Sequence, residues 1–425
     1  MQAKPELLAP AGGWSQLKAA LRFGADAVYL ACDRFGMRAR ADNFKLEEMG
    51  DVVAYAHERG AKVHVTLNTL MDARDIRVLP EYLEALAAAE ADAFIIGDMG
   101  AFALAKRHAP NVDIHVSTQA SIMNAEAARM WHELGAKRIV CAREMSVADI
   151  AEMHENIPSD LEIEAFVHGA MCVAYSGRCL LSSVMTGRSA NKGACAQSCR
   201  WSYALVEEQR PGEYFEIEED TRGTFVLNAQ DMNMVSHLDD LANAGVDSFK
   251  IEGRNKQAFY VATVVGAYRS VLDGGDVVAA ERELLTISHR PYSTGFYYGR
   301  AEQTPERDGY VKECLHVATV EDCAPTQDGR YRVTALCHNR FEREDSLGVV
   351  SPYTNPYEIK VGGPICWLAP ADGGKPFVER EPMTLAEARA QSIETPVSVA
   401  NRSKERYTFF ADAPVKPGDY LRKRV

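Results

Sequence analysis

Short apolar segments alternate with longer amphipathic ones through the first two thirds of the chain, and this alternation constrains the fold more than any other feature. Eight of the apolar segments have the length and composition of strands, at residues 6–9, 27–31, 62–67, 92–97, 113–117, 137–142, 161–167 and 246–252. Helical patterns separate them, for example at 14–23, 46–59, 79–89, 126–134 and 256–272. Strands that alternate with helices predict βαβ units around a parallel sheet.

A weak internal repeat favours a closed barrel over an open sheet. The segments that begin at Gly24, Ala91, Gly135 and Ala244 each place a small residue at a helix end and continue into an apolar strand. Eight such strands fit a (β/α)₈ barrel, and no G-x-G-x-x-G motif follows the first strand, as a Rossmann fold requires. The predicted fold class is therefore α/β, a TIM-like (β/α)₈ barrel.

The predicted barrel domain spans residues 1–287 and is interrupted by an inserted segment at 168–224, followed by a predicted extra strand at 225–228. Residues 288–309 are rich in glycine and aromatic side chains and are predicted to form a connector. From 310 to 425 the pattern changes to short strands with turns, at 332–337, 346–351, 397–401 and 407–411. This pattern predicts a small C-terminal all-β domain, built as a barrel.

Charge and hydropathy exclude several classes of protein. The 425 residues include 47 Lys and Arg against 60 Asp and Glu, and this net charge of −13 argues against indiscriminate nucleic-acid binding, although a local basic patch remains possible. No apolar stretch approaches the roughly 20 residues of a membrane helix, and residues 1–6 lack the apolar core of a secretion signal. We therefore expect a cytoplasmic protein that does not enter a membrane.

Four of the ten cysteines lie within the inserted segment, at Cys172, Cys179, Cys195 and Cys199, with the spacing C-x₆-C-x₁₅-C-x₃-C. Without a secretion signal, a disulfide framework is not expected. Four thiolates can bind an iron–sulfur cluster or a zinc ion, and the spacing favours iron–sulfur because zinc modules usually carry tighter C-x₂-C pairs. Zinc, and four structural cysteines that bind no metal, are the alternatives.

The inserted segment also differs from the rest of the chain in charge. Residues 165–206 contain no Asp or Glu, whereas Arg178, Arg188, Lys192 and Arg200 contribute four positive charges. A local excess of this kind favours an anionic partner such as an RNA backbone or a carboxylate substrate. The alternative is that these cations offset the negative charge of a thiolate-bound cluster.

Several of these segments resemble peptidase family U32. The run 164–182 with Cys195 and residues 199–201 is similar to the signature of that family, and residues 6–12, 249–254 and 289–296 match it as well. Within the family the sequence looks most like the members that hydroxylate tRNA. The resemblance implies an enzyme that converts wobble uridine to 5-hydroxyuridine without oxygen, with prephenate as co-substrate and a 4Fe–4S cluster on the four cysteines.

The family also contains members that act on ribosomal RNA or support quinone hydroxylation, and these remain alternatives together with a collagenase-like peptidase. The ribosomal type is usually longer than 425 residues, and the quinone type is shorter and works with a second, related chain. The residues give the peptidase little support, because neither H-E-x-x-H nor G-x-S-x-G occurs. The cysteine nearest to a histidine base is Cys172, close to His168, and it is already a predicted metal ligand.

Polar residues at or just beyond the predicted strand ends are the candidate substrate-binding groups, because barrel enzymes place their chemistry there. A dicarboxylate such as prephenate suits guanidinium groups, which bind carboxylates bidentately, or else these arginines form salt bridges with Glu144 or Glu252. The candidates are Arg143 and Arg254, then Arg38 and Arg40, together with Asn68, Gln119 and, in the inserted segment, Arg178.

The candidate catalytic residues are His168, Glu252 and Tyr175. His168 follows the seventh strand and suits a general acid or base, or else it holds the cysteine segment in shape. Tyr175 and Trp201 offer rings on which an extruded uridine can stack, or else they pack against the cluster. The expected partners are tRNA and prephenate. Basic residues near the C terminus are either RNA contacts or ordinary surface groups: Arg402, Lys404, Arg406 and 422–424.

Overall fold

The computed structural model describes residues 4–37, 42–171, 175–201, 204–205, 215–216, 230–299, 311–379 and 383–425. The chain divides into two compact units. One unit comprises Met1–Glu281 with His289–Val311, and the other comprises Arg282–Ser288 with Lys312–Val425. Residues 289–299, predicted as a connector, therefore pack with the first unit.

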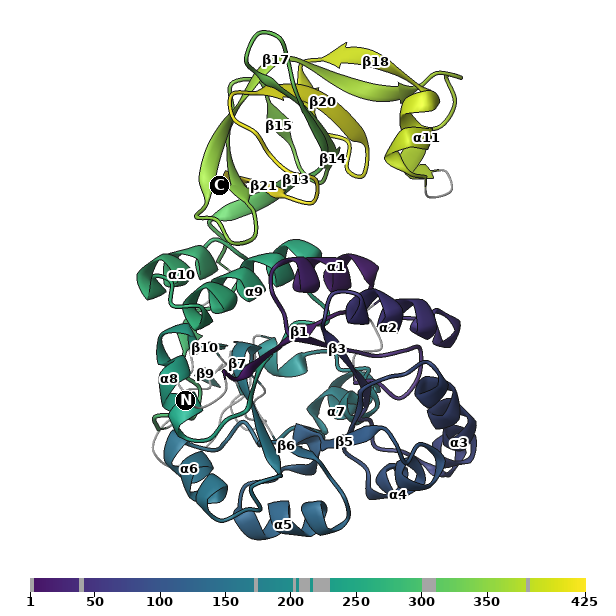
Figure 1. Ribbon diagram of the computed structural model, residues 1–425, viewed down its shortest axis with the longest axis vertical. Coiled ribbons are helices and arrows are strands. Elements are labelled where there is room, and N and C mark those ends of the chain that lie inside the picture. Colours follow the sequence, from purple (N-terminus) through teal and green to yellow (C-terminus); the bar gives the residue numbers. More distant parts are fainter. Residues whose placement is uncertain are drawn as a thin grey trace. The chain divides into compact units, whose positions relative to one another are not determined.

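Eight parallel strands close into a barrel in the first unit (Figure 1), because β11 pairs with both β1 and β7. The strands are β1 (Glu6–Pro10), β2 (Ala27–Leu30), β3 (Lys62–Leu67), β4 (Ala93–Ile96), β5 (Asp113–Val116), β6 (Arg138–Val140), β7 (Glu162–Ala170) and β11 (Ser248–Ile251). The predicted (β/α)₈ barrel is confirmed, and all eight predicted strands lie where the apolar segments placed them.

Helices follow the strands and surround them in Figure 1. They are α1 (Trp14–Arg22), α2 (Met49–His57), α3 (Ala73–Ala88), α4 (Met99–His108), α5 (Ala125–Glu133), α6 (Val147–Glu155), α8 (Leu238–Asn243), α9 (Ala258–Leu272) and α10 (Val277–Leu284). A short helix, α7 (Leu181–Thr186), lies instead within the inserted cysteine segment. Within the described residues, no helix combines the length and apolarity needed to cross a membrane.

Local sequence signals set most helix ends. Side chains of Asp98, Asn124 and Ser146 accept backbone hydrogen bonds at the first turns of α4, α5 and α6. The repeated glycines at 24, 135 and 245 all have positive φ, which is the conformation that ends a helix and redirects the chain into the next strand.

The start of α3 is a correction to the sequence prediction. The predicted helix began at Leu79, next to Pro80, whereas the observed helix begins at Ala73 and contains the proline. Asp72 and Asp75 form a reciprocal cap at its first turn. That cap stabilises the first of about two helical turns that precede Pro80, and the helix continues through the proline despite the backbone hydrogen bond that the proline removes.

Strand β7 is longer than its neighbours and extends the sheet beyond the barrel. Its end pairs in antiparallel fashion with β10 (Asp231–Asn233), which pairs in turn with β12 (Tyr292–Ser293). The register between β7 and β11 shifts by one residue, since Lys250 faces Phe166 but Ile251 faces His168. This bulge determines where the His168 side chain lies.

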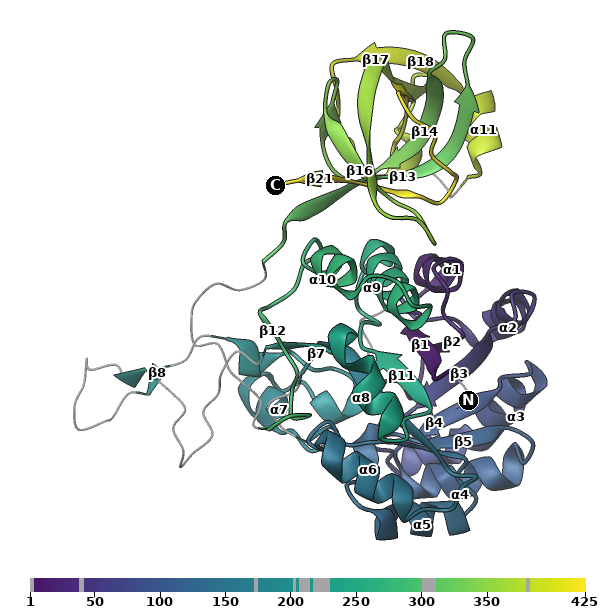
Figure 2. The ribbon, with the colours of Figure 1, turned by 60° about the vertical axis from the view of Figure 1, so that its left-hand side comes forward.

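The second unit is a closed antiparallel β-barrel (Figure 2), which confirms the predicted all-β domain. Its sheet has the order β16–β21–β13–β14–β20–β17–β18 and closes through a β16–β17 pairing around a buried apolar core. The strands are β13 (Cys314–Pro325), β14 (Tyr331–Cys337), β16 (Ser346–Val350), β17 (Tyr357–Pro370), β18 (Ser392–Val397), β20 (Arg406–Ala411) and β21 (Tyr420–Arg424). Smaller elements are β15 (Phe341–Glu342), β19 (Val399–Ala400) and α11 (Leu385–Ala390), and the inserted segment contains β8 (Ala204–Leu205) and β9 (Phe215–Glu216).

Candidate functional site

A cavity opens at the carboxyl ends of the barrel strands, where barrel enzymes carry out their chemistry. Its volume of about 150 Å³ greatly exceeds the about 10–15 Å³ that one water needs, so a small organic molecule fits. Nine of the predicted site residues line it: Asn68, Gln119, Arg143, Tyr175, Cys179, Cys195, Cys199, Glu252 and Arg254. The structure thus brings these residues together, and their chemical roles stay predictions.

Arg143 follows β6 and is almost completely buried. Its Nη1 donates to Ser176 Oγ at 3.2 Å, and its Nη2 lies 3.4 Å from Glu252 Oε2. The guanidinium carbon is 4.1 Å from the ring centroid of Phe166. The predicted alternative of a salt bridge with Glu252 is therefore observed, yet this ion pair is long and the guanidinium still lines the cavity.

Arg254 follows β11, and its side chain points back over the barrel. Its Nη1 donates to Thr66 Oγ1 of β3 at 2.9 Å, and the whole residue is 3% exposed. Asn68, just beyond the end of β3, uses its Oδ1 to accept the backbone N–H of Met37 at 3.2 Å. The two guanidinium groups give this cavity a positive character, which suits a carboxylate-bearing ligand.

Gln119 lies just beyond the end of β5 and presents an acceptor atom without a partner. Its Oε1 is buried and has no hydrogen-bond partner among the described residues. Gly177 packs against it, since a Cβ at that glycine would lie 3.0 Å from Gln119 Oε1, and Gly177 has φ of +76°. An unpaired buried amide oxygen costs about 1–3 kcal/mol, so this atom is positioned for a donor on a ligand.

Three of the four predicted metal ligands, Cys179, Cys195 and Cys199, line the same cavity and form no disulfide. They are partly or fully exposed, in contrast to Cys32 and Cys141, which are buried in the barrel. Arg188 Nη2 and Ser182 Oγ hydrogen-bond to the backbone at Cys195 and Ala196, and these contacts hold the loop. Three thiols that line one cavity outside the apolar core fit a metal or cluster better than a packed core. The fourth ligand, Cys172, lies outside the described residues, as do Arg38 and Arg40.

The rim of the cavity carries exposed side chains. Tyr175, which lines the cavity, is 45% exposed, and Trp201, which does not line it, is 46% exposed. Arg178 is also exposed but does not line the cavity, so the structure separates it from Arg143 and Arg254. Rings in such positions are accessible to a stacking base.

His168 is brought close to the site but does not line the cavity. Because the register shifts at this point, its ring packs outside the barrel against α9, 5.4 Å from the Tyr268 ring centroid. Its Nδ1 lies 3.3 Å from Tyr268 Oη, and Nε2 has no partner among the described residues. Burial lowers the pKa of His168 to about 3, so the imidazole is neutral near pH 7. Its predicted part in proton transfer stays a prediction.

A charged network, which the sequence analysis did not predict, fills the lumen nearer the amino ends of the strands. Arg138 Nη1 donates to Glu6 at 2.6 Å and to Glu164 at 3.1 Å, and Arg138 also pairs with Glu162 at 2.7 Å. Lys250 Nζ donates to Glu164 Oε1 at 2.7 Å. We refer to Glu6, Arg138, Glu162, Glu164 and Lys250 as the lumen network. Burial raises the pKa of Glu164, but Lys250 and Arg138 outweigh burial and hold it below its usual range.

Two buried histidines adjoin the lumen network. The ligand atoms of His64, His115 and Glu164 lie within 4.8 Å of one another, and Nδ1 of each histidine lacks a partner among the described residues. Burial first, and Arg138 second, lower the pKa of His64 to about 3. Both oxygens of Glu164 already accept hydrogen bonds from cations, so this group offers a metal ion no uncommitted anionic ligand.

Sequence reasoning missed Lys250 and the lumen network because charged residues within barrel strands look like interruptions of an apolar run. A signal existed, however. His64, His115 and Glu164 each occupy the third position of their strands, and equal positions in barrel strands face the lumen in one layer.

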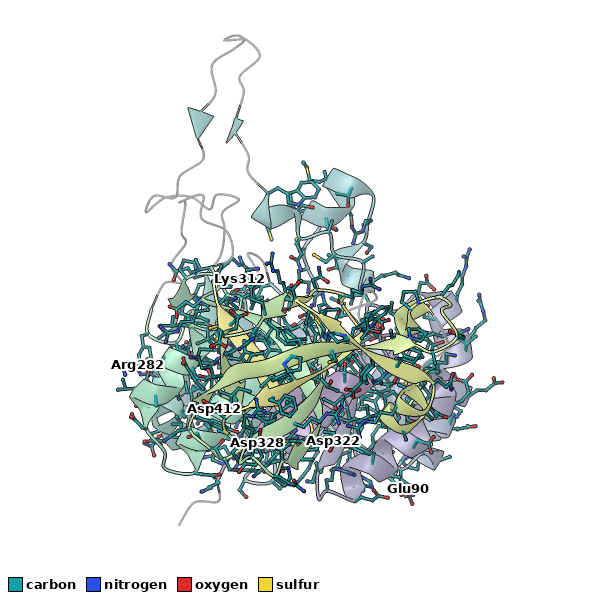
Figure 3. All side chains as sticks on the ribbon, turned by 90° about the horizontal axis from the view of Figure 1, so that it is seen from above. Glu90, Arg282, Lys312, Asp322, Asp328 and Asp412 are labelled. Carbon is teal, nitrogen blue, oxygen red and sulfur yellow. The ribbon has the colours of Figure 1, made fainter. Side chains whose placement is uncertain are left out.

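Basic side chains of the C-terminal unit have carboxylate partners. The pairs are Arg406 with Glu321, Arg422 with Glu283, and Lys423 with Asp345. Asp322 and Asp328, labelled in Figure 3, pair with Arg389 and Arg330. For Arg406, Arg422 and Lys423 this pairing favours a structural role over contact with RNA phosphates.

Comparison with known proteins agrees with the resemblance seen in the sequence. The family model described as Peptidase family U32 matches residues 12–307. The chain is 42% identical to tRNA hydroxylation protein P1 of Bacillus subtilis (strain 168), over 70% of this chain and 71% of that protein. It is 31% identical to tRNA hydroxylation protein P of Escherichia coli (strain K12), over 87% and 92%. A collagenase of Porphyromonas gingivalis (strain ATCC BAA-308 / W83) is 33% identical, over 69% and 74%. The chain belongs to peptidase family U32.

Proposed function

We propose that this protein is a tRNA-modifying enzyme that hydroxylates wobble uridine to 5-hydroxyuridine, with prephenate as co-substrate and without oxygen. The observation that carries the proposal is one cavity in which two guanidinium groups, Arg143 and Arg254, meet three thiols of the cysteine segment. The similarity to proteins named for tRNA hydroxylation supports the same conclusion.

The cavity suits prephenate in charge and in hydrogen-bonding groups. Prephenate is a dicarboxylate, and guanidinium groups bind carboxylates through paired N–H donors. Arg143 and Arg254 are both at least nine-tenths buried, so their electrostatic attraction for a carboxylate is screened less than at a surface. Gln119 Oε1 adds an acceptor for a hydroxyl or N–H group of the bound molecule.

The donor set of the cysteine segment fits a 4Fe–4S cluster, which Cys172, Cys179, Cys195 and Cys199 would hold. When bound, such a cluster supplies one-electron transfer and Lewis acidity. Arg188, in a segment without acidic residues, offsets part of the negative charge that thiolate ligands bring, whereas Lys192 pairs with Asp72 and Asp75. Zinc on the same thiolates is the alternative, and metal analysis separates the two.

Features of the rim support RNA as the substrate. The exposed rings of Tyr175 and Trp201 lie in the segment that lacks acidic residues and carries exposed Arg178. Unpaired bases stack on such rings, and a phosphate backbone is attracted by a local positive charge. A uridine extruded from a tRNA loop meets both requirements at the mouth of this cavity.

Peptidase activity is the second candidate, because a relative named collagenase is 33% identical to this chain. A cysteine peptidase needs a base within hydrogen-bond distance of its thiol. Among the described residues that line the cavity there is no histidine, and His168 faces Tyr268 instead. The geometry therefore gives less support to peptide hydrolysis than to a carboxylate-dependent reaction on RNA. Relatives that act on ribosomal RNA or quinones are tested by the same experiment.

Nucleoside mass spectrometry of tRNA tests the proposal. A strain that lacks this gene, and any second copy of the enzyme, is complemented with wild type, Cys179→Ala or Cys141→Ala. We expect 5-hydroxyuridine and its derivatives to disappear in the deletion strain and to return with wild type and Cys141→Ala only. Iron should be lost from purified Cys179→Ala and retained in Cys141→Ala, because Cys141 is buried away from the cavity.

Unchanged wobble uridines in the deletion strain would overturn the proposal. Ribosomal RNA nucleosides and quinones from the same cultures would then be compared. Cleavage of a peptide substrate by protein stripped of iron would favour the peptidase, whereas zinc with no iron in the wild-type protein would refute the proposed cluster.

A further inference from the structure

Lys250 is a buried lysine of the cavity to which the proposed function assigns no role. It is the third residue of β11, is 4% exposed, and is one of the residues that line the cavity. Its side chain belongs to the lumen network through Glu164 and also lines the cavity. A buried lysine is unusual, and its position requires a reason beyond packing.

Three neighbours surround the amino group. Nζ donates to Glu164 Oε1 at 2.7 Å and lies 4.5 Å from the ring centroid of Tyr29 and 5.6 Å from that of Phe166. Burial lowers the pKa of Lys250, although Glu164 opposes that shift. Desolvation is one way in which lysine amines become nucleophiles, and Glu164 Oε1 lies within reach of the proton that the ammonium must lose.

The same cavity holds the groups that bind carboxylates. Arg143 lies against Phe166, the ring that Lys250 also approaches, and Arg254 lies on the same strand-to-loop segment as Lys250. A ligand that satisfies both kinds of group has a carboxylate for a guanidinium and a carbonyl carbon for the amine. An α-keto acid has these two functions on adjacent carbons.

We propose that Lys250 forms an imine with the keto group of an α-keto acid bound in this cavity. The inference rests on the proposed function, since prephenate carries an α-keto acid side chain. The ammonium of Lys250 first gives a proton to Glu164. The amine nitrogen then attacks the keto carbon, a C–N bond forms, and the C–O bond breaks.

The atoms and charges of this step balance without another reagent. The ammonium and the ketone become a protonated imine and one water. Both hydrogens of that water come from the lysine nitrogen, and Glu164 transfers them to the departing oxygen. No electrons are exchanged, so the step needs neither oxidant nor reductant. Its effect is to hold the keto acid covalently and to withdraw electrons from it.

Reductive trapping tests the inference. The cluster-loaded protein is incubated with prephenate or phenylpyruvate and sodium cyanoborohydride, digested, and analysed by mass spectrometry. We expect a reduced adduct on Lys250 in wild type and in the control Lys256→Arg, whose lysine does not line the cavity. The adduct should be lost in Lys250→Arg, which keeps a cation beside Glu164. Succinate, a dicarboxylate without a keto group, should give no adduct and should reduce the yield with phenylpyruvate.

Two results separate this inference from the proposed function. If wild type hydroxylates tRNA with prephenate but Lys250 is never modified, the imine is refuted and the tRNA role stands. If Lys250 is modified but tRNA is unaltered, the imine stands and the tRNA role is refuted. Because the wild-type protein gives both answers, a Lys250 variant that fails to fold does not affect the test.

Discussion

The lumen network and the cavity occupy the same barrel and use similar side chains, but they pair their charges differently. In the lumen network, Arg138 has carboxylates at 2.6, 2.7 and 3.1 Å, and Lys250 has one at 2.7 Å. In the cavity, Arg143 lies 3.4 Å from Glu252, and Gln119 Oε1 lacks a partner among the described residues. The lumen network pairs its charges at short distances, whereas the cavity contains a longer ion pair and, at Gln119 Oε1, an acceptor that is available to a ligand.

The largest expected effect is on the lumen network. Glu164→Gln removes the shared carboxylate of Lys250 and Arg138 while keeping its shape, and it leaves two buried cations with fewer partners. We expect the free energy of unfolding to fall by about 3–5 kcal/mol, measured by urea unfolding. The control Glu162→Gln, at a side chain 35% exposed, should cost about 1 kcal/mol or less. Equal losses in the two variants would contradict the comparison.

The next effect concerns the cavity. Arg143→Lys keeps the charge but loses the fork of donors, so we expect prephenate to bind with about 1.5–3 kcal/mol less free energy, roughly tenfold to a hundredfold in Kd. Isothermal titration calorimetry measures this change. Arg178→Lys is the matched control, since Arg178 is exposed and outside the cavity. If that control lost as much affinity, the carboxylate site would have to lie on the rim.

Acid should destabilise the barrel through its buried histidines. The folded-state pKa of His64 is about 3, against about 6.5 in an unfolded chain. Between these values only the unfolded state takes up the proton, so stability falls by about 1.4 kcal/mol per pH unit as pH falls through this window. Above pH 6.5 the effect vanishes, since the imidazole is neutral in both states. Unfolding free energies at pH 7, 6 and 5 should fall less steeply for His64→Leu than for wild type; equal slopes would refute this explanation.

The smallest effect separates stability from binding. Gln119→Leu removes an amide oxygen that has no partner among the described residues and whose burial costs about 1–3 kcal/mol, so we expect the unfolding free energy not to fall. Prephenate or uridine binding should weaken by about 1 kcal/mol, roughly fivefold. A variant that loses stability but keeps full affinity would show that Gln119 belongs to the packing rather than to the ligand site.

Much of the barrel could be predicted from local signals. Apolar segments bounded by small residues located all eight strands, and the glycines at 24, 135 and 245 marked helix ends that the backbone confirms. The rule that barrel chemistry lies at the carboxyl strand ends selected nine residues that line one cavity. These signals come from residues that are close together in the sequence, so each strand can be located without knowledge of the strands that pair with it.

Features that depend on pairing between distant strands were not predictable in the same way. Whether the His168 side chain faces the lumen or α9 depends on one extra residue in β7 relative to β11. The pattern of apolar residues within a single strand does not indicate such a shift. Lys250 appeared in a matched motif, but its pairing with Glu164 needs the closed barrel. In the C-terminal unit, β13 and the long β17 escaped prediction because polar residues and the Gly362–Gly363 pair interrupt their apolar pattern.

Strands β7 and β11 pair directly, although the cysteine segment lies between them in the chain. The pairing that closes the barrel runs between residues 164–168 and 248–251, so none of the described cysteines of the segment takes part in it. With the proposed cluster, this connectivity separates two events in the cell, the folding of a newly made chain and the delivery of the metal. A shortage of iron should then leave a reservoir of finished barrels that recover when iron returns, without new protein synthesis.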